Sequence, residues 1–306
     1  MQYLSRALIA SFLADAIQAS HAEELALRDG LLADLEAGTI VLMLPAGGIE
    51  QVDITTGNSL WTSEAADRPL IIDAGALVAQ VDTAQPGRMD VAAISLNDGT
   101  TLQSYSVELP EDVAPLIDDS LGRQFKIRGL GSNAFAWQHV KKVVQGATLR
   151  DAPAPKRHEG AMGLDGSRLK AVDLPTGDAK ANLWRAADTS PVVKIPDVKG
   201  RQFRSLSGEY TLVTERTRPE SAQPYRWQVY APDGSLRGSF FSAISYTPFV
   251  VLEGIVLQVT QPNTQRQEDG SLKREGLTLR AYDLESGSVV WCREIRDTRY
   301  RGPMPP

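Results

Sequence analysis

Cysteine and histidine are scarce in this sequence, whose 306 residues include one cysteine, Cys292, and three histidines, His21, His139 and His158. A single cysteine excludes an intramolecular disulfide and a zinc site made of several thiolates. The histidines do not have the HxH or HExxH spacing of a metal site, so no metal ligand is predicted. Cys292 follows the apolar residues 289–291, and this context predicts a small core residue.

A dominant charge and long apolar runs are also missing. The net charge is −6 and the lysines and arginines are scattered, which excludes the basic stripe expected of a nucleic-acid-binding protein. No segment approaches the roughly 18 consecutive apolar residues of a transmembrane helix. With 42% hydrophobic and 23% charged residues, the composition is that of a folded globular chain. We therefore expect no nucleic-acid partner and no membrane span, and the oligomeric state stays open.

Familiar catalytic and cofactor-binding signatures are absent as well. The sequence has no GxSxG elbow, no phosphate-binding P-loop and no dinucleotide fingerprint. The acid pairs at 111–112 and 118–119 fall in expected loops, where carboxylates are normally solvated. The Asp-Gly-Ser segments at 165–167 and 269–271 resemble fragments of calcium loops, but no series of oxygen ligands follows them. We therefore expect no catalytic residue, no bound cofactor and no metal site.

The N-terminus has the order of a secretory signal peptide. Arg6 precedes the apolar residues 7–14, and small residues follow where a signal peptidase would cleave. Residues 1–22 are therefore predicted to be a signal peptide that directs export to the periplasm or the cell exterior. Because Asp15 interrupts the apolar run, an ordinary N-terminal helix remains the alternative. Residues 23–37 are expected to form a helix or a linker.

From residue 38 to residue 306 the sequence is predicted to form a single β domain with internal repeats. Two stretches, 69–109 and 248–295, each divide into four short β-rich runs separated by turn residues. The same spacing of proline and glycine opens both stretches. Repeats of about 40 to 50 residues with four strands each are typical of β-propeller blades, because one such sheet cannot bury its own faces.

The turn between the third and fourth strands carries the most specific pattern. Its clearest copy comprises Ala281, Asp283, Ser286, Gly287 and Trp291. A second copy comprises Asp53, Thr56, Gly57 and Trp61, and a weaker third comprises Ala171, Asp173, Thr176 and Gly177. Glycine accepts positive φ, the Asp can cap the turn, and the Trp supplies a flat apolar surface between neighbouring blades. We expect these residues to hold the structure together.

The pattern Ala-x-Asp-x-x-Thr-Gly-x-x-x-Trp resembles the tryptophan-docking repeat of the quinoprotein-like (pyrroloquinoline-quinone repeat) β-propeller family. The resemblance implies an all-β fold, a β-propeller of four-stranded blades. Enzymes of that family use a quinone and calcium, often beside an adjacent-cysteine disulfide that a single cysteine excludes here. We therefore predict a noncatalytic propeller that binds a protein or glycan, with a small quinone-dependent or sugar-acting enzyme as the alternative.

The spacing of the turn glycines predicts the number of blades. They fall at positions 57, 99, 177, 234 and 287, which indicates five blades, with six or seven as alternatives. The first unit supplies only three strands, at 39–44, 49–54 and 59–62. The chain end around residues 296–301 is expected to add the fourth strand and to close the ring with strands from both termini.

Two polar segments interrupt the repeats. The Gly-Arg-Gln-Phe sequences at 122–125 and 200–203 are each interpreted as the start of a blade. The blade that begins near residue 123 would then contain an insertion at 145–159. A second irregular segment spans 261–275. Loops carried on a rigid scaffold often provide recognition, so these two segments are the predicted binding elements.

Overall fold

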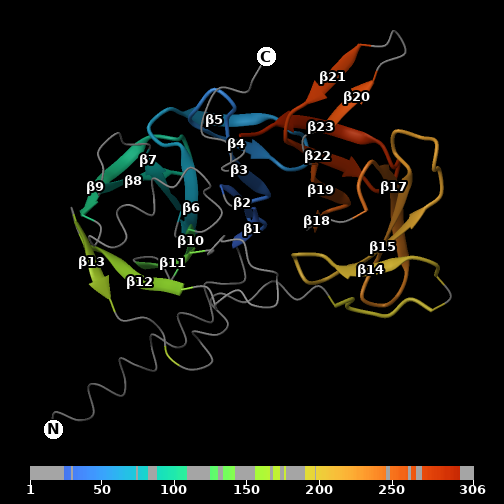
Figure 1. Cartoon of the computed structure of the whole chain (residues 1–306), viewed down its shortest axis with the longest axis horizontal. Coiled ribbons are helices and arrows are strands. Elements are labelled where there is room, and N and C mark those ends of the chain that lie inside the picture. The colour runs from blue at the N-terminus through green and yellow to red at the C-terminus, as the bar shows by residue number, and fades with distance from the viewer. Residues whose placement is uncertain are drawn as a thin grey trace, which may run out of the picture. The chain divides into compact units, whose positions relative to one another are not determined.

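The structure is a computed structural model in which all regular secondary structure of the described residues is β-strand (Figure 1). The described residues are 24–28, 30–73, 75–81, 88–108, 125–129, 134–141, 156–165, 168–172, 176, 190–196, 198–245, 249–260, 263–266 and 271–296. None of these segments forms a helix that could cross a membrane.

The chain divides into two compact units. One comprises Met1–Glu24, Thr62–Arg185 and Thr298–Pro306, and the other comprises Leu25–Trp61 and Ala186–Asp297. The second unit therefore joins the N-terminal sheet to the C-terminal part of the sequence.

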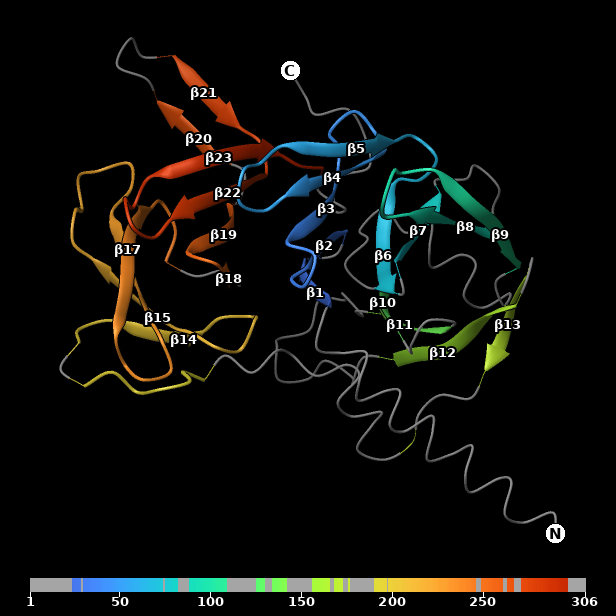
Figure 2. The ribbon, with the colours of Figure 1, turned by 180° about the vertical axis from the view of Figure 1, so that it is seen from behind.

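The second unit contains three larger sheets, each with its strands in chain order (Figure 2). Sheet A consists of β1 (Glu24–Arg28), β2 (Leu31–Asp34), β3 (Thr39–Met43), β4 (Ile49–Asp53) and β5 (Ser59–Ser63). Sheet C consists of β14 (Arg201–Arg204), β15 (Thr211–Arg216), β16 (Tyr225–Tyr230) and β17 (Leu236–Ser242). Sheet D consists of β18 (Phe249–Leu252), β19 (Ile255–Thr260), β22 (Thr278–Asp283) and β23 (Val289–Glu294).

The N-terminal part of sheet A corrects two expectations. Residues expected to form a helix or a linker form the hairpin β1–β2, so two strands precede the three predicted between residues 39 and 62, and the sheet has five. Asp29-Gly30 is a hairpin turn sequence, and Gly30 has the positive φ of 79° that such a turn requires. Leu27 and Leu31 are 4% and 1% exposed, so burial in the sheet outweighs any local helical preference.

The first unit contains sheet B, whose two halves are each a run of consecutive antiparallel strands. The first half is β6 (Arg68–Asp73), β7 (Ala76–Val81), β8 (Arg88–Ser95) and β9 (Thr101–Glu108), as predicted. The second half is β10 (Phe125–Gly129), β11 (Ala134–Lys141), β12 (Lys156–Asp165) and β13 (Arg168–Val172). A single parallel pair, Arg168 with Ser106, joins the halves. The expected insertion at 145–159 overlaps β12, so its last four residues belong to a strand.

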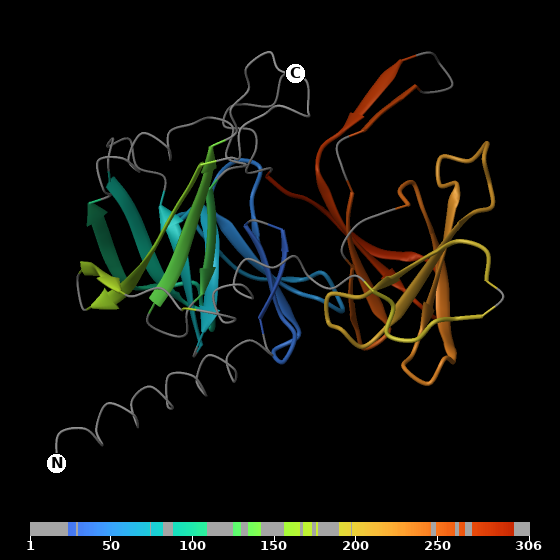
Figure 3. The same ribbon diagram turned by 60° about the horizontal axis from the view of Figure 1, so that its bottom comes forward.

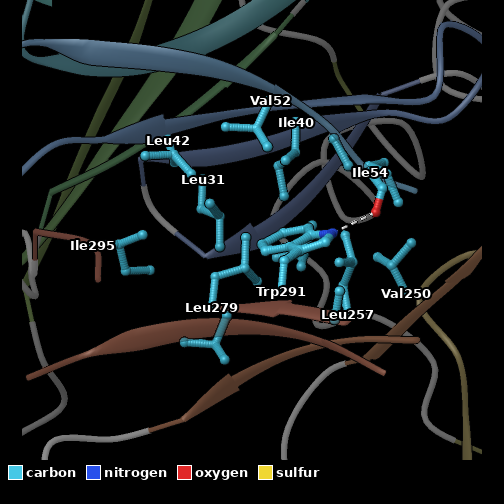
Figure 4. Close-up of a cluster of buried hydrophobic side chains, with 14 of the residues drawn as sticks. Leu31, Ile40, Leu42, Val52, Ile54, Val250, Leu257, Leu279, Trp291 and Ile295 are labelled. Carbon is cyan, nitrogen blue, oxygen red and sulfur yellow. Dashed lines mark hydrogen bonds between the residues drawn. The ribbon is translucent and has the colours of Figure 1, made fainter. Parts of the chain in front are cut away.

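Sheets of the second unit pack face to face through two hydrophobic clusters. One cluster joins sheets A and D through residues that include Leu31, Ile40, Leu257 and Trp291 (Figure 4). The other joins sheets C and D through residues that include Trp227, Phe240, Phe249 and Tyr282. Sheet D is thus covered on both faces, which is how propeller blades bury their surfaces. The fold is all-β and of the β-propeller type; the number of blades and the ring closure stay predictions.

Candidate functional site

The tryptophan of the C-terminal repeat lies between sheets D and A. Trp291 is 8% exposed, and its Nε1–H donates a hydrogen bond of 2.8 Å to the carbonyl oxygen of Ile54 (Figure 4). Leu31, Ile40 and Leu257 belong to the same buried cluster. Because the ring buries its apolar surface and its one polar atom has a hydrogen-bond partner, this contact stabilises the packing of sheet D on sheet A.

Gly57 of the other repeat copy lies against this indole ring. A Cβ atom placed on Gly57 would come within 2.7 Å of Cβ and Cδ1 of Trp291, closer than real side chains approach. Gly57 also has a φ of 71°, in the region that favours glycine. Two repeat copies that are more than 200 positions apart therefore form one contact, in which the turn of sheet A receives the tryptophan of sheet D.

Arginine adds a second link across the same boundary. Arg293 donates from Nη2 to the carbonyl oxygen of Gly57 at 2.8 Å, and Nη2 lies 3.9 Å from Oε1 of Glu50. The Glu50 side chain is only 8% exposed, so its carboxylate depends on this cation more than an exposed carboxylate would. Glu50 was not singled out from the sequence, because no repeat marks it.

The last described residue of the chain contacts sheet A. The backbone N–H of Arg296 donates to the carbonyl oxygen of Met43 at 2.9 Å. The described residues end here, so the predicted strand at 296–301 lies mostly outside them. Sheet A obtains its additional strands from β1 and β2, which precede the first predicted strand.

Sheets C and D meet without a tryptophan at the docking position of the repeat. Gly238 follows the turn glycine Gly234 by four residues, the offset that Trp291 has from Gly287. A Cβ on Gly238 would overlap the backbone carbonyl of Leu284, and a Cβ on Gly287 would lie 2.6 Å from the carbonyl oxygen of Ser239. The backbones of the two sheets therefore approach too closely for any side chain. Gly238 could have been identified from the sequence, because it stands four residues after a turn glycine, where the repeat has its tryptophan.

Four turns use an aspartate in the same way. Asp53 accepts hydrogen bonds from the Thr55 and Thr56 hydroxyls. The other three, Asp98, Asp233 and Asp283, accept from the hydroxyl and the backbone N–H of a Thr or Ser two or three residues later. These hydrogen bonds stabilise the charged carboxylate and lower the pKa of each aspartate below its ordinary value of 3.8. Each carboxylate therefore stabilises the turn in which it lies.

Acid should weaken the fold through these turns. Because the pKa values are lowered in the folded state, the unfolded chain binds more protons as the pH falls toward 3.8 and below. The stabilisation is complete well above pH 3.8 and is lost as the pH drops through the folded-state values. Urea unfolding between pH 5 and pH 3 should show a falling midpoint. Changing all four aspartates to asparagine should flatten this dependence, and an unchanged slope would contradict the assignment.

The most polar part of the interface between sheets C and D is a buried group around Gln258. Oε1 of Gln258 accepts a hydrogen bond of 2.7 Å from the Ser242 hydroxyl, and both residues are fully buried. Burial raises the pKa of the neighbouring Tyr282 phenol. Trp227 and Phe249 pack beside this group with ring centroids 4.4 Å apart. Dense aromatic packing indicates a structural role for this interface.

The described part of the segment 261–275 is a strand pair that belongs to none of the larger sheets. Its strands are β20 (Asn263–Arg266) and β21 (Leu272–Glu275), which pair only with each other. In the chain the hairpin follows β19 and precedes β22, and its labelled strands extend away from sheet D in Figure 1; Figure 3 shows the same ribbon turned. A two-stranded hairpin has no sheet face of its own to bury.

The remaining predicted residues have mixed outcomes. Ala281 lies in β22 and pairs with Trp291, and Trp61 is 7% exposed in β5. Ala171 lies in β13, the fourth strand of its run, whereas Ala281 lies in a third strand. Thr176 is exposed, while Asp173 and Gly177 lie outside the described residues.

The expectation of a buried cysteine was wrong. Cys292 is exposed in β23, directly after the buried Trp291. Alternate residues of a strand face opposite sides, so an inward Trp291 places Cys292 on the other face of this outer strand. Over the ranges given above, no three His, Cys, Asp or Glu side chains gather in a way that could hold a metal ion.

Comparisons with known proteins add similarities of low identity. No family model and no curated protein matches the chain. A europium-containing methanol dehydrogenase is 13% identical over 92% of this chain and 71% of its own, with a TM-score of 0.25. A β-propeller domain from Myceliophteria thermophila is 11% identical over 86% of this chain and 85% of its own, with a TM-score of 0.29. An uncharacterised protein from Listeria monocytogenes is 10% identical over 86% and 64%, with a TM-score of 0.24.

Proposed function

We propose that this protein is an exported, noncatalytic β-propeller of the quinoprotein-like kind that binds a protein or a glycan. The observation that carries the proposal is how the repeat residues are used. Trp291 bridges two sheets and Gly57 receives it, while Asp53 and Asp283 bind the hydroxyl or backbone groups of their own turns. The repeated residues thus serve the scaffold, and recognition is left to the segments that are not repeated.

Two such segments support a binding role. The hairpin β20–β21 lies in the connection between the second and third strands of sheet D. The equivalent connection in sheet C, between β15 and β16, is shorter. The connection between β11 and β12, residues 142–155, lies outside the described residues, and in the sequence basic residues flank it at Lys141 and Lys156. Insertions at the ends of rigid blades are positioned to contact a partner without disturbing the core.

The direct test is a titration with pyrroloquinoline quinone and calcium, followed by assays of alcohol and sugar oxidation. A cofactor enzyme must bind the cofactor and hold its reactive atom against the substrate. We expect neither saturable quinone binding nor turnover. Stoichiometric quinone binding with turnover would show that the protein is the small quinone-dependent enzyme instead.

Export is a separate part of the proposal and rests on residues 1–22, which lie outside the described residues. Mass spectrometry of the protein purified from its native source should find a mature N-terminus near residue 23, in an extracytoplasmic fraction. A chain that retains Met1 in the cytoplasmic fraction would contradict the export.

A further inference from the structure

A segment without regular secondary structure lies on sheet C and is held there by two side chains. Residues 190–196 precede β14, and Val193 and Ile195 are bound through their backbone groups. The Thr211 hydroxyl in β15 accepts a hydrogen bond of 3.0 Å from the N–H of Val193 and donates one of 3.1 Å to its carbonyl oxygen. Oε1 of Gln202 in β14 accepts from the N–H of Ile195 at 3.0 Å, and Nε2 donates to the Ile195 carbonyl oxygen at 2.9 Å. Each side chain therefore binds both backbone groups of one residue.

The positions of Gln202 and Thr211 match the spacing of residues in an extended chain. The antiparallel register pairs Gln202 with Val213, which is two residues from Thr211, so the two side chains are diagonal neighbours on one face of sheet C. Such neighbours lie about 7–8 Å apart, and alternate residues of an extended chain are about 7 Å apart. The two side chains can therefore bind residues i and i+2 of an extended peptide, as they do with Val193 and Ile195.

The face that holds this segment is turned away from sheet D. Phe203, next to Gln202 in β14, packs against the buried cluster between sheets C and D, and alternate residues of a strand face opposite sides. Thr211 is 0% exposed, so its hydroxyl is held in place where it meets the backbone of the segment. Gln202 and Thr211 thus form a binding site with fixed polar groups, which lies outside the core between the two sheets.

The segment has the sequence of an extended peptide. Val193 and Ile195 are β-branched, and Pro196 restricts Ile195 to an extended backbone. Lys194 is exposed and the residues on both sides of it are half-buried, so solvent reaches the segment. The segment is not a strand of sheet C. A second extended chain can therefore replace it without opening the core.

We propose that Gln202 and Thr211 form a docking site for an extended peptide of a partner protein, and that residues 190–196 occupy this site when no partner is bound. The inference rests on the proposed binding function and narrows the partner to a protein. The four hydrogen bonds involve only backbone groups of the segment, so the site recognises an extended chain with free N–H groups at alternate residues.

The chain's own segment acts as a competitor of the partner. Covalent attachment gives a tethered segment an effective concentration on the order of millimolar. A partner peptide must exceed this competition, so weakly binding peptides are rejected and the segment sets a threshold for docking.

The test uses the full chain with residues 191–196 replaced by glycine and serine in equal number, with circular dichroism to show that the fold is retained. The probe is a fluorescent peptide with the sequence of residues 190–196, and its anisotropy is measured. We expect saturable binding to the replaced chain and at least about tenfold weaker binding to the wild type, whose own segment competes. No binding to the replaced chain, or equal binding to both chains, would overturn the proposal.

Two glutamines on the same face provide a matched pair of variants. Val213 pairs with Gln202 on one side and with Gln228 on the other, so both glutamines share the face. In the replaced chain, Gln202→Met should weaken peptide binding about tenfold because two hydrogen bonds are lost, and Thr211→Val should have a similar effect. Gln228→Met, two strands away in β16, should change binding less than about twofold. Equal effects of the two glutamine substitutions would contradict the assignment.

Methylated peptides test whether the backbone is what the site recognises. Methyl groups on the nitrogens that correspond to Val193 and Ile195 remove both donors, so this peptide should bind at least about tenfold more weakly than the unmodified one. Methylation at the intervening Lys194 leaves these hydrogen bonds intact and should reduce affinity less than about twofold. Equal weakening by both modifications would refute backbone recognition.

Hydrogen exchange of the wild-type chain provides a measurement that does not depend on the folding of any variant. Unlabelled peptide at a concentration on the order of millimolar should displace the chain's own segment, so the amide hydrogens of Val193 and Ile195 should exchange faster. Unchanged exchange would contradict the displacement. Absence of peptide binding would refute this site alone, whereas quinone turnover would refute the noncatalytic function, so the two failures are distinguishable.

Discussion

Replacing Trp291 with alanine is expected to lower the free energy of unfolding by about 3–5 kcal/mol. The substitution leaves a cavity between sheets A and D, and it removes the 2.8 Å hydrogen bond to the carbonyl oxygen of Ile54. That carbonyl would remain in a largely apolar interface, which adds to the cost. Urea or guanidinium unfolding, followed by circular dichroism, would measure the loss.

Two further variants make this experiment specific. Trp291→Phe keeps most of the apolar contact but not the N–H donor, so its loss should lie between those of the wild type and the alanine variant. Cys292→Ala changes the adjacent exposed residue and should shift the stability by less than about 0.5 kcal/mol. A loss below about 1 kcal/mol for Trp291→Ala would mean that the ring does not join the sheets.

Gly57→Ala is expected to be far more costly than Gly38→Ala, although both glycines have similar backbone angles. Their φ values are 71° and 66°, so at either position the left-handed conformation of an alanine lowers the free energy of unfolding by about 1–2 kcal/mol. At Gly38 nothing lies within 4 Å of the added Cβ, whereas at Gly57 the Cβ meets Trp291. Overpacking of this kind typically adds about 1–3 kcal/mol.

A double-mutant cycle would assign the difference to the tryptophan. In a Trp291→Ala background the ring is gone but the Cβ of residue 291 remains, so Gly57→Ala should cost less than it does in the wild type and still more than Gly38→Ala does. Equal costs of the two glycine substitutions in the wild-type background would contradict the docking of Trp291 on Gly57.

Much of the local structure could be predicted because its causes are local. The strands of sheet D and of the first half of sheet B follow from short β-rich runs between turn residues. The Asp-x-x-Ser-Gly sequence at 283–287 forms its turn through contacts within five residues, including a hydrogen bond from the Ser286 backbone N–H to Asp283. Such interactions depend little on what packs against them.

The incorrect expectations have tertiary causes. A run such as residues 23–37 can be read as a helix or as strands, and the choice was made by burial of Leu27 and Leu31 in the cluster between sheets A and D. Cys292 was expected in the core because its neighbours are apolar. Its exposure follows from the strand's position at the outer edge of sheet D, which its neighbours do not reveal.

The sequence by itself therefore determined the all-β character, most strand positions and the chemistry of the turns, since these depend on residues close together in the chain. Only the tertiary structure decided that Trp291 meets Gly57, that Gly238 lies against Leu284, and that His139 stands opposite His158. Each of these pairings is set by strand register or by the stacking of sheets. Strand register and sheet stacking both depend on how much apolar surface the whole fold buries, and a short segment of sequence does not determine this.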